Sequence, residues 1–226
     1  MARRNLTALS RLTLLAVAVL TGCAAAPPEP LTALPSHQLE LLTPPAVPKV
    51  DKPDAPRPET TQQSQWDVKD GRPWRYVVIH HSDSDFGNAE VFDAWHRSRG
   101  FDELGYHFVI TNGRGAGDGQ VQVGSRWTKQ KWGAHTGGTP DNEYNNFGIG
   151  ICVVGTFGSQ SPSAAQLESL RRLTLYLARK YHIAPENVIG HRDAPNARTD
   201  CPGDELYEHL NNTLRPYLMR QLLKPQ

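Results

Sequence analysis

The segment Arg75-Tyr-Val-Val-Ile-His-His81 decides how the fold of this chain is interpreted. An aromatic residue and three β-branched residues follow one another without a polar interruption, and such a run is typical of a buried β-strand. Residues 106–111 and 147–154 form two further runs of the same kind. Because two histidines end the first run, the sequence predicts a buried strand that carries a polar side chain to the edge of a sheet.

Helical patterns alternate with these strands. Asn88 precedes a segment with apolar residues on one side that ends at Gly100, and Ser161-Pro162 supplies a cap and a first-turn proline for a second helix. A third helix is expected from about Asp204. The apolar positions that define the last two helices are all leucines, at 167, 170, 173 and 177 and at 206, 210, 214 and 218.

Two shorter strands complete the pattern. The glycine-rich residues 112–119 are expected to turn the strand 106–111 back into a strand at 120–123, and residues 187–190 form a short apolar run before His191. Strands and helices that alternate along the chain favour layers of both kinds. The sequence therefore predicts an α/β fold, a single domain with a central mixed β-sheet flanked by helices.

The first residues predict a lipoprotein signal peptide (residues 1–22). Three arginines precede the apolar stretch 12–20, which leads into Leu20-Thr-Gly-Cys23. This order is typical of an export signal, and the apolar run is far shorter than the ~20 residues of a membrane span. The last four residues resemble the bacterial lipobox, which implies that Cys23 is lipidated and anchors the exported chain to the cell envelope. An ordinary cleaved signal with an incidental cysteine is the alternative.

Residues 23–65 are predicted to be a proline-rich, disordered tether, and residues 66–226 the folded domain. Ten of the 18 prolines lie between Pro27 and Pro58, a density that prevents helices and sheets from continuing. Without residues 1–22, the chain has 21 basic and 23 acidic residues. This balance argues against a nucleic-acid partner, which requires a basic face, and no protein partner is predicted.

Two histidines and one cysteine form a candidate metal site. His80 and His191 each follow an apolar strand, and Cys201 comes ten residues after His191 in a loop with two prolines. Two imidazoles and a thiolate are ligands that Zn²⁺ accepts, with a fourth position left for water. On spacing alone, structural histidines remain the alternative. Cys152, inside the run 147–154, is expected to be buried and inert.

The wider pattern resembles a known family. It is similar to the zinc amidases shared by phage lysozyme-type N-acetylmuramoyl-L-alanine amidases and peptidoglycan recognition proteins, over about residues 74–203. The motifs that carry this resemblance, in chain order, are Val78-Ile-His-His-Ser82, Leu104-Gly-Tyr-His-Phe108, Gly133-Ala-His-Thr-Gly-Gly138, Gly148-Ile-Gly-Ile151 and Gly190-His-Arg-Asp193 through Thr199-Asp-Cys-Pro-Gly203.

The resemblance implies a role for each matching position. His80, His191 and Cys201 fall on the family's metal ligands, and Tyr106 falls on its catalytic tyrosine. A second catalytic position, lysine in some members and threonine in others, falls on Thr199. A threonine donates a hydrogen bond but carries no positive charge. The expected reaction is hydrolysis of the amide between the lactyl group of N-acetylmuramic acid and L-alanine in peptidoglycan.

Further residues near these motifs are candidates for substrate binding. His135, Trp132 and Arg198 are expected to contact peptidoglycan or muropeptides, with Arg198 compensating for the missing lysine. A loop histidine and a packing tryptophan are the alternatives for the first two. Trp127 is expected to stack on substrate or to belong to the core. His81 and His107 are expected to point away from the site and to pack or support it.

Two other functions remain open from the sequence. A non-catalytic peptidoglycan-binding module is the main alternative, although family members that only bind often lack the cysteine ligand. The second alternative is a metal enzyme that acts on a different exported amide or peptide.

Overall fold

The computed structural model describes residues 65–69 and 71–224 of the chain. All of these residues belong to one compact unit. The predicted signal peptide, the predicted lipidation site Cys23 and the predicted tether up to residue 64 lie outside the described residues, so the domain boundaries remain predictions. No helix within the described part of the chain is long and apolar enough to cross a membrane.

Within the described residues, five strands form one sheet in the order β3-β2-β4-β1-β5. Four of them run parallel, and β3 pairs antiparallel with β2 at one edge, so the predicted mixed sheet and its hairpin are confirmed. The strands are β1 (Tyr76–His81), β2 (Phe108–Ile110), β3 (Val121–Val123), β4 (Gly148–Val153) and β5 (Val188–Gly190).

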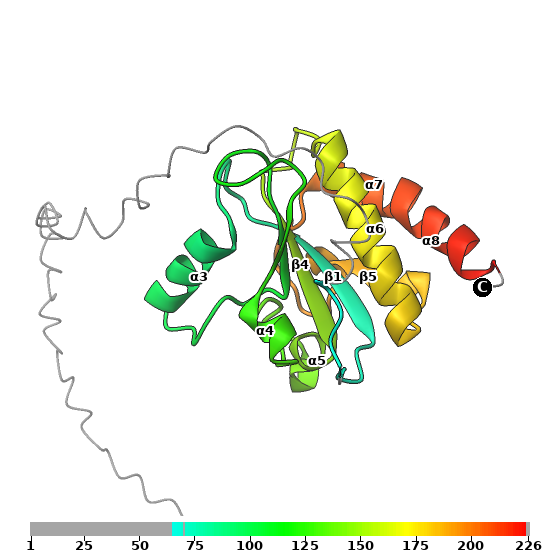
Figure 1. The fold of residues 1–226 in the computed structure, drawn as a ribbon, viewed down its shortest axis with the longest axis horizontal. Helices are drawn as coiled ribbons and strands as arrows, with labels where there is room; N and C mark the ends of the chain where they lie inside the picture. The colour runs from blue at the N-terminus through cyan, green and yellow to red at the C-terminus, as the bar shows by residue number, and fades with distance from the viewer. Residues whose placement is uncertain (1–64, 70, 225–226) are drawn as a thin grey trace, which may run out of the picture. The chain divides into compact units, whose positions relative to one another are not determined.

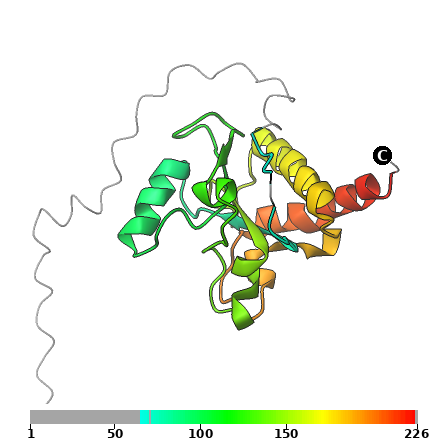
Figure 2. The same cartoon turned by 60° about the horizontal axis from the view of Figure 1, so that its bottom comes forward.

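Helices cover both faces of this sheet, as Figure 1 and Figure 2 show, with α3 on one side and α6, α7 and α8 on the other. The α-helices are α3 (Ala89–Ser98), α4 (Ser125–Thr128), α5 (Glu143–Asn146), α6 (Ala164–Tyr181), α7 (Asp204–His209) and α8 (Arg215–Leu222). Short 3₁₀ turns are η1 (Pro140–Asn142), η2 (Pro185–Asn187) and η3 (His191–Asp193), and η4 (Leu210–Leu214) is a π-helical segment.

The two faces of the sheet differ in chemistry. Side chains of odd-numbered β1 and β4 residues, such as Ile79 and Ile151, join the main core with the leucines of α6. Neighbouring strand residues point to opposite faces, so His80 and its register partner Cys152 lie on the other face. There Cys152 belongs to a smaller apolar cluster with Phe92 of α3. His80 therefore lies on the face of the sheet that carries the smaller apolar cluster.

The predicted cap of α6 is wrong by two residues. Ser163 caps the helix: its hydroxyl accepts from the Gln166 backbone N–H at 3.1 Å, and the Gln166 side chain accepts from the Ser163 N–H at 3.1 Å. This reciprocal pair is a capping box, which outweighs the proline signal of Ser161-Pro162. Ser161 instead donates to the carboxylate of Glu205 at 2.6 Å.

The C-terminal helix begins at Asp204 as predicted and buries its four leucines, but it contains a π-helical segment that the sequence pattern did not indicate. Leucines that recur every four residues drift by about 40° per step around a regular α-helix. The wider π turn reduces this drift. It also ends two residues before Pro216, whose missing N–H removes one helical hydrogen bond.

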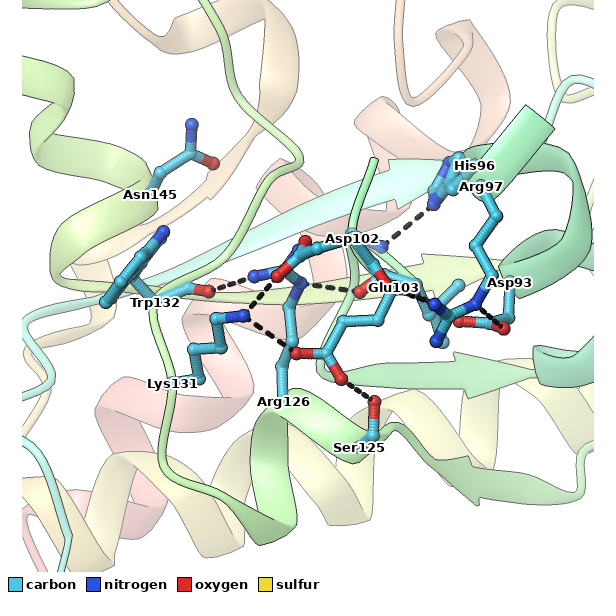
Figure 3. Close-up of polar contacts among 12 residues, drawn as sticks. Asp93, His96, Arg97, Asp102, Glu103, Ser125, Arg126, Lys131, Trp132 and Asn145 are labelled. Atoms are coloured by element: carbon cyan, nitrogen blue, oxygen red, sulfur yellow. Dashed lines mark hydrogen bonds and ion pairs between the residues drawn. The ribbon is translucent and has the colours of Figure 1, made fainter. Parts of the chain in front are cut away.

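A network of charged side chains ties the segment before β2 to the segment after β3 (Figure 3). The Arg126 side chain is 1% exposed. It donates to the carbonyl oxygens of Leu104 at 2.6 Å and Trp132 at 2.8 Å, and it pairs with Asp102. Arg126 therefore joins the chain just before Tyr106 to the chain just before His135.

Glu103 belongs to the same network and is almost fully buried. Its carboxylate accepts from Lys129 at 2.8 Å and Lys131 at 3.1 Å, and also from the Ser125 hydroxyl. Burial raises the pKa of Glu103, but these hydrogen bonds outweigh that effect and lower the pKa to about 2. The folded state thus favours the charged carboxylate.

We expect Glu103→Gln to destabilise the fold by about 1–2 kcal/mol at pH 7, because it removes charge-assisted hydrogen bonds from a buried site. The depressed pKa means that this stabilisation is complete above pH 4.5 and is lost as the pH falls towards 2. Urea unfolding at pH 7 and near pH 2 should therefore show a difference between variant and wild type that narrows in acid. Glu208→Gln, at an exposed position, serves as the matched control. An equal loss of unfolding free energy in that variant would contradict the stabilising role assigned to the buried Glu103 carboxylate.

Candidate metal centre and active site

The three predicted metal ligands meet at one edge of the sheet. His80 lies in β1 and is 1% exposed, and Cys201 is also buried. His191 follows directly after β5. The potential ligand atoms of His80, His191 and Cys201 all lie within 4.8 Å of one another. The structure thus brings together three side chains separated by up to 121 positions in the sequence.

Parallel pairing of β1 with β5 explains how the two histidines meet. Ile79 lies opposite Gly190 in the register of these strands. The residue after each of these is a histidine, His80 within β1 and His191 just past the end of β5, so the two histidines lie at the same level of the sheet. The two imidazole rings are 4.6 Å apart between centroids.

The loop from His191 to Gly203 curls back onto the strand ends, as its two prolines and its lack of apolar periodicity predicted. The Arg192 backbone N–H donates to the Cys201 carbonyl at 2.9 Å. The Asp193 carboxylate accepts from the Gly190 N–H at 2.9 Å and from the Tyr207 hydroxyl at 2.6 Å. These bonds fix the thiol against β1, where the His81 N–H donates to Cys201 Sγ at 3.4 Å.

The spacing and charge of these groups fit a divalent metal. Cys201 Sγ lies 3.7 Å from His80 Nδ1, close to the ~3.6 Å edge of a tetrahedron with the bond lengths that Zn²⁺ makes to sulfur and nitrogen. Burial lowers the pKa of His80 and of His191, so both imidazoles have a free lone pair. Burial raises the pKa of the Cys201 thiol to about 12. A bound cation is the kind of partner that would deprotonate it.

Tyr106 and Thr199 border this group. The Tyr106 ring lies 5.2 Å from the His80 ring between centroids. Burial, followed by the nearby thiols of Cys152 and Cys201, raises the pKa of Tyr106 well above its usual value, so the phenol keeps its proton. The Thr199 hydroxyl oxygen accepts from the Cys201 N–H at 3.1 Å, and its own hydrogen is available to donate.

A cavity of about 350 Å³ opens beside Cys201 and Thr199. His80 faces the two other ligands, whereas His81 lines this cavity together with Thr199 and Cys201. His81 thus borders the candidate site, although the sequence analysis expected it to point away from the site. Three aspartates also line it, at positions 83, 200 and 204.

His107 and Trp127 are core residues. Both are fully buried. The His107 Nδ1 accepts from the Gly150 N–H at 2.9 Å, so the Nε2–H donates to the Lys131 carbonyl at 3.0 Å. Burial lowers the pKa of His107 to about 4, which keeps the ring neutral. Packing, rather than contact with a ligand, is therefore confirmed for both side chains.

The three predicted substrate-binding residues occupy different environments. Trp132 is 49% exposed, and Arg198 is exposed as well. His135 is only 8% exposed, with its Nδ1 3.1 Å from His80 Nε2. A direct contact between His135 and a predicted metal ligand was not expected from the sequence. Binding of substrate by these residues stays a prediction.

Asn145 is a buried residue that the sequence analysis missed. Its Oδ1 accepts from the backbone N–H groups of His135 at 2.8 Å and Thr136 at 2.9 Å. Its Nδ2 donates to the Thr136 carbonyl at 2.9 Å and to Asn142 Oδ1 at 2.8 Å. No periodicity or motif marks this residue, because its role depends on a loop that reaches it through the fold.

We expect Asn145→Ala to destabilise the fold by about 1–3 kcal/mol, because two buried N–H groups lose their acceptor. Native-state hydrogen exchange should show faster exchange at His135 and Thr136. Asn146→Ala is the matched control, since its half-buried side chain makes one hydrogen bond, at 3.0 Å to the Asp141 carbonyl. Unchanged exchange at both amides in the Asn145 variant would show that the side chain does not hold this loop.

A family model and the related sequences both assign this chain to one family. The family described as "Amidase_2: N-acetylmuramoyl-L-alanine amidase" matches residues 70–204. Peptidoglycan-recognition protein 2 of Holotrichia diomphalia is 31% identical over 162 residues, which cover 67% of this chain and 78% of that protein. The N-acetylmuramoyl-L-alanine amidase of Sus scrofa is 32% identical over 152 residues, which cover 61% of this chain and 23% of that protein. The chain thus spans about a quarter of the length of the N-acetylmuramoyl-L-alanine amidases of Sus scrofa and Homo sapiens.

Solved structures agree with the sequence relatives. The endolysin amidase LysCS of Clostridium intestinale URNW superimposes with a TM-score of 0.53 at 28% identity, over 63% of this chain and 84% of that chain. The mixed sheet and its flanking helices therefore belong to a fold found in amidases and peptidoglycan recognition proteins. Because the family match covers more than half of the chain and includes both histidines of the candidate centre together with Cys201, this chain belongs to the Amidase_2 family of N-acetylmuramoyl-L-alanine amidases.

Proposed function

We propose that this chain is a zinc-dependent amidase that hydrolyses the bond between the N-acetylmuramoyl lactyl group and L-alanine of peptidoglycan stem peptides. The observation that carries the proposal is the convergence of His80, His191 and Cys201, whose ligand atoms lie within 4.8 Å of one another. Membership in a family with named amidases supports a hydrolase.

His80, His191 and Cys201 are the residues that would hold the metal. Zinc, when bound, supplies a Lewis acid that polarises a carbonyl and a means of activating water near neutral pH. Three protein ligands leave room for water or substrate, which distinguishes catalytic from structural zinc sites. The backbone bonds of the loop 191–201 would keep the cysteine in place while substrate binds.

We propose that Tyr106 stabilises negative charge during the reaction. Its phenol keeps its proton because burial raises its pKa, and its ring lies 5.2 Å from that of His80. A preorganised hydroxyl near the reacting carbonyl stabilises the oxyanion that forms during amide hydrolysis. We assign this donor role to Tyr106.

Thr199 would supply a second hydrogen-bond donor. Its oxygen is held by the Cys201 N–H at 3.1 Å, which leaves the hydroxyl hydrogen directed elsewhere. A neutral hydroxyl gives less electrostatic stabilisation than a lysine would. We propose that the exposed Arg198, one residue away, contributes the missing positive charge when substrate is bound.

A non-catalytic peptidoglycan-binding module is the second candidate, because peptidoglycan-recognition proteins are among the relatives. A binding surface does not require two neutral imidazoles and a buried thiol whose potential ligand atoms lie close together. Their convergence at 4.8 Å or less therefore favours catalysis. Peptidoglycan or muropeptides are the proposed ligand under either function.

We expect the full chain with zinc to release intact stem peptides with a free L-alanine amino terminus from purified sacculi, as identified by mass spectrometry. Cys201→Ala should lose both bound zinc and activity, because one of three ligands is removed. Cys152→Ala is the matched control, since Cys152 is the other free buried cysteine among the described residues, and it should keep its zinc.

Binding of the chain to sacculi without release of any fragment would favour the binding module. Release of fragments cut at another bond would indicate a different amide substrate. Full activity in Cys201→Ala or after chelation would contradict the zinc mechanism.

Tyr106→Phe should reduce kcat by roughly 10²–10³-fold while the zinc content stays at the wild-type level. The substitution removes only the hydroxyl and preserves the ring that packs beside His80. Phe86, the matched control, packs against Trp95 at 5.9 Å between ring centroids, and Phe86→Leu should leave kcat close to wild type. An unchanged kcat in Tyr106→Phe would rule out the proposed donor role.

We further propose that the chain is exported and lipid-anchored to the cell envelope through Cys23, on the periplasmic face or at an outer membrane. The support is the order of charged, apolar and small residues in positions 1–23. Stable anchoring requires two or more acyl chains, which a lipobox cysteine would carry. The proline-rich residues that follow would then let the enzyme reach the cell wall.

In a bacterial host we expect Cys23→Ala to shift the protein from the membrane fraction to the soluble fraction of the envelope or culture. Cys152→Ala should remain with the membranes. Retention of the Cys23 variant in the membrane fraction, without mobility change on a gel, would contradict lipidation at this residue.

A further inference from the structure

His135 and His80 meet through their ring nitrogens. His135 Nδ1 lies 3.1 Å from His80 Nε2, and the two rings are 5.0 Å apart between centroids with an interplanar angle of 75°. Both side chains are buried. The contact joins the loop after α4 to strand β1, across 55 positions in the sequence.

The contact made by His80 Nδ1 determines which of the two ring nitrogens of His80 carries the hydrogen. His80 Nδ1 faces Cys201 Sγ at 3.7 Å, so it is the nitrogen directed at the proposed metal. A nitrogen that binds a metal has no hydrogen, and a neutral imidazole carries one N–H. His80 Nε2 must therefore be the donor, and His135 Nδ1 lies at the right distance to accept.

The hydrogen-bond partners of His135 also indicate that His135 Nδ1 is the acceptor and His80 Nε2 the donor. His135 Nε2 lies 3.3 Å from the Gly148 carbonyl, which accepts only, so the hydrogen of His135 is on Nε2 and Nδ1 is bare. The Thr136 hydroxyl, 2.8 Å from the same Nδ1, adds a second donor and does not require a hydrogen on it. The hydrogen bonds thus run in one direction, from His80 through His135 to Gly148.

The fold holds the His135 ring tightly in this orientation. A Cβ added to Gly150 of β4 would lie 2.4 Å from His135 Cδ2, and one added to Gly133 would lie 2.3 Å from it. Gly150 pairs with Val78, two residues before His80 on the same face of the sheet. Glycine at these positions lets the ring rest against the backbone, and Asn145 fixes the backbone of His135 itself.

We propose that His135 is a positioning residue that fixes the tautomer and orientation of His80 for metal binding. The proposal rests on the proposed function, because it assigns His80 to the metal. A partner that accepts the remote N–H of a ligating histidine orients the ring and makes the metal-binding nitrogen more basic. Both His135 ring nitrogens are engaged within the protein, so this role differs from the substrate contact predicted from the sequence.

Two substitutions separate the two ring nitrogens of His135. In His135→Asn, the side-chain oxygen can occupy the place of Nδ1 and accept from His80. In His135→Gln, the longer side chain reaches the place of Nε2 near Gly148 and leaves His80 without its acceptor. Thr136→Val is the control, because it removes the second donor and keeps the acceptor for His80.

The experiment measures zinc affinity of the full chain by competition with a chelator, together with nitrogen-15 NMR of the His80 tautomer in the metal-free protein. We expect His135→Gln to bind zinc about 10–100-fold more weakly. His135→Asn and Thr136→Val should stay close to wild type. In the metal-free wild type, His80 should carry its hydrogen on Nε2.

Equal zinc affinity in His135→Gln and wild type would overturn the proposal, as would a His80 hydrogen on Nδ1 in the metal-free wild type. The NMR result is obtained without any substitution, so it decides the question even if a variant fails to fold. A wild type that binds zinc with the expected tautomer but does not cleave peptidoglycan would contradict the proposed activity and leave the role of His135 intact.

Discussion

The parallel pairing of β1 with β4 on one side and β5 on the other is the constraint on which the candidate site depends. It places Ile79 opposite Gly190 and His80 opposite Cys152. A shift of one residue along β1 would turn His80 into the main core and Ile79 into the site. The apolar side chains that fill the core therefore also fix the register that brings the imidazoles together.

The face of the sheet that carries His80 is built differently from the core face. Large aliphatic residues such as Ile79 and Ile151 pack under α6, whereas Gly150 and Cys152 occupy the site face. Small residues there leave room for polar rings to approach the backbone. The sheet thus combines a closely packed stabilising side with a side that accommodates histidines at hydrogen-bonding distance.

Much of this arrangement could be predicted from the sequence. Apolar runs indicated β1 and β4, and the motif order indicated His80, His191 and Cys201 together. The register between strands, the Ser163 capping box and the π-helical segment were not predicted. The local sequence signals for these features are weak and compete with one another. The roles of His135 and Asn145 depend on where the loop 131–136 lies in the folded chain, and no local pattern encodes that position.

The most direct test of the central claim is X-ray absorption spectroscopy at the zinc edge on the purified, zinc-loaded full chain. The account predicts one sulfur ligand at about 2.3 Å and two imidazole nitrogens at about 2.0–2.1 Å, with a further light-atom ligand from solvent. A coordination shell without sulfur, or without imidazole, would contradict it, because His80, His191 and Cys201 would then not share one ion.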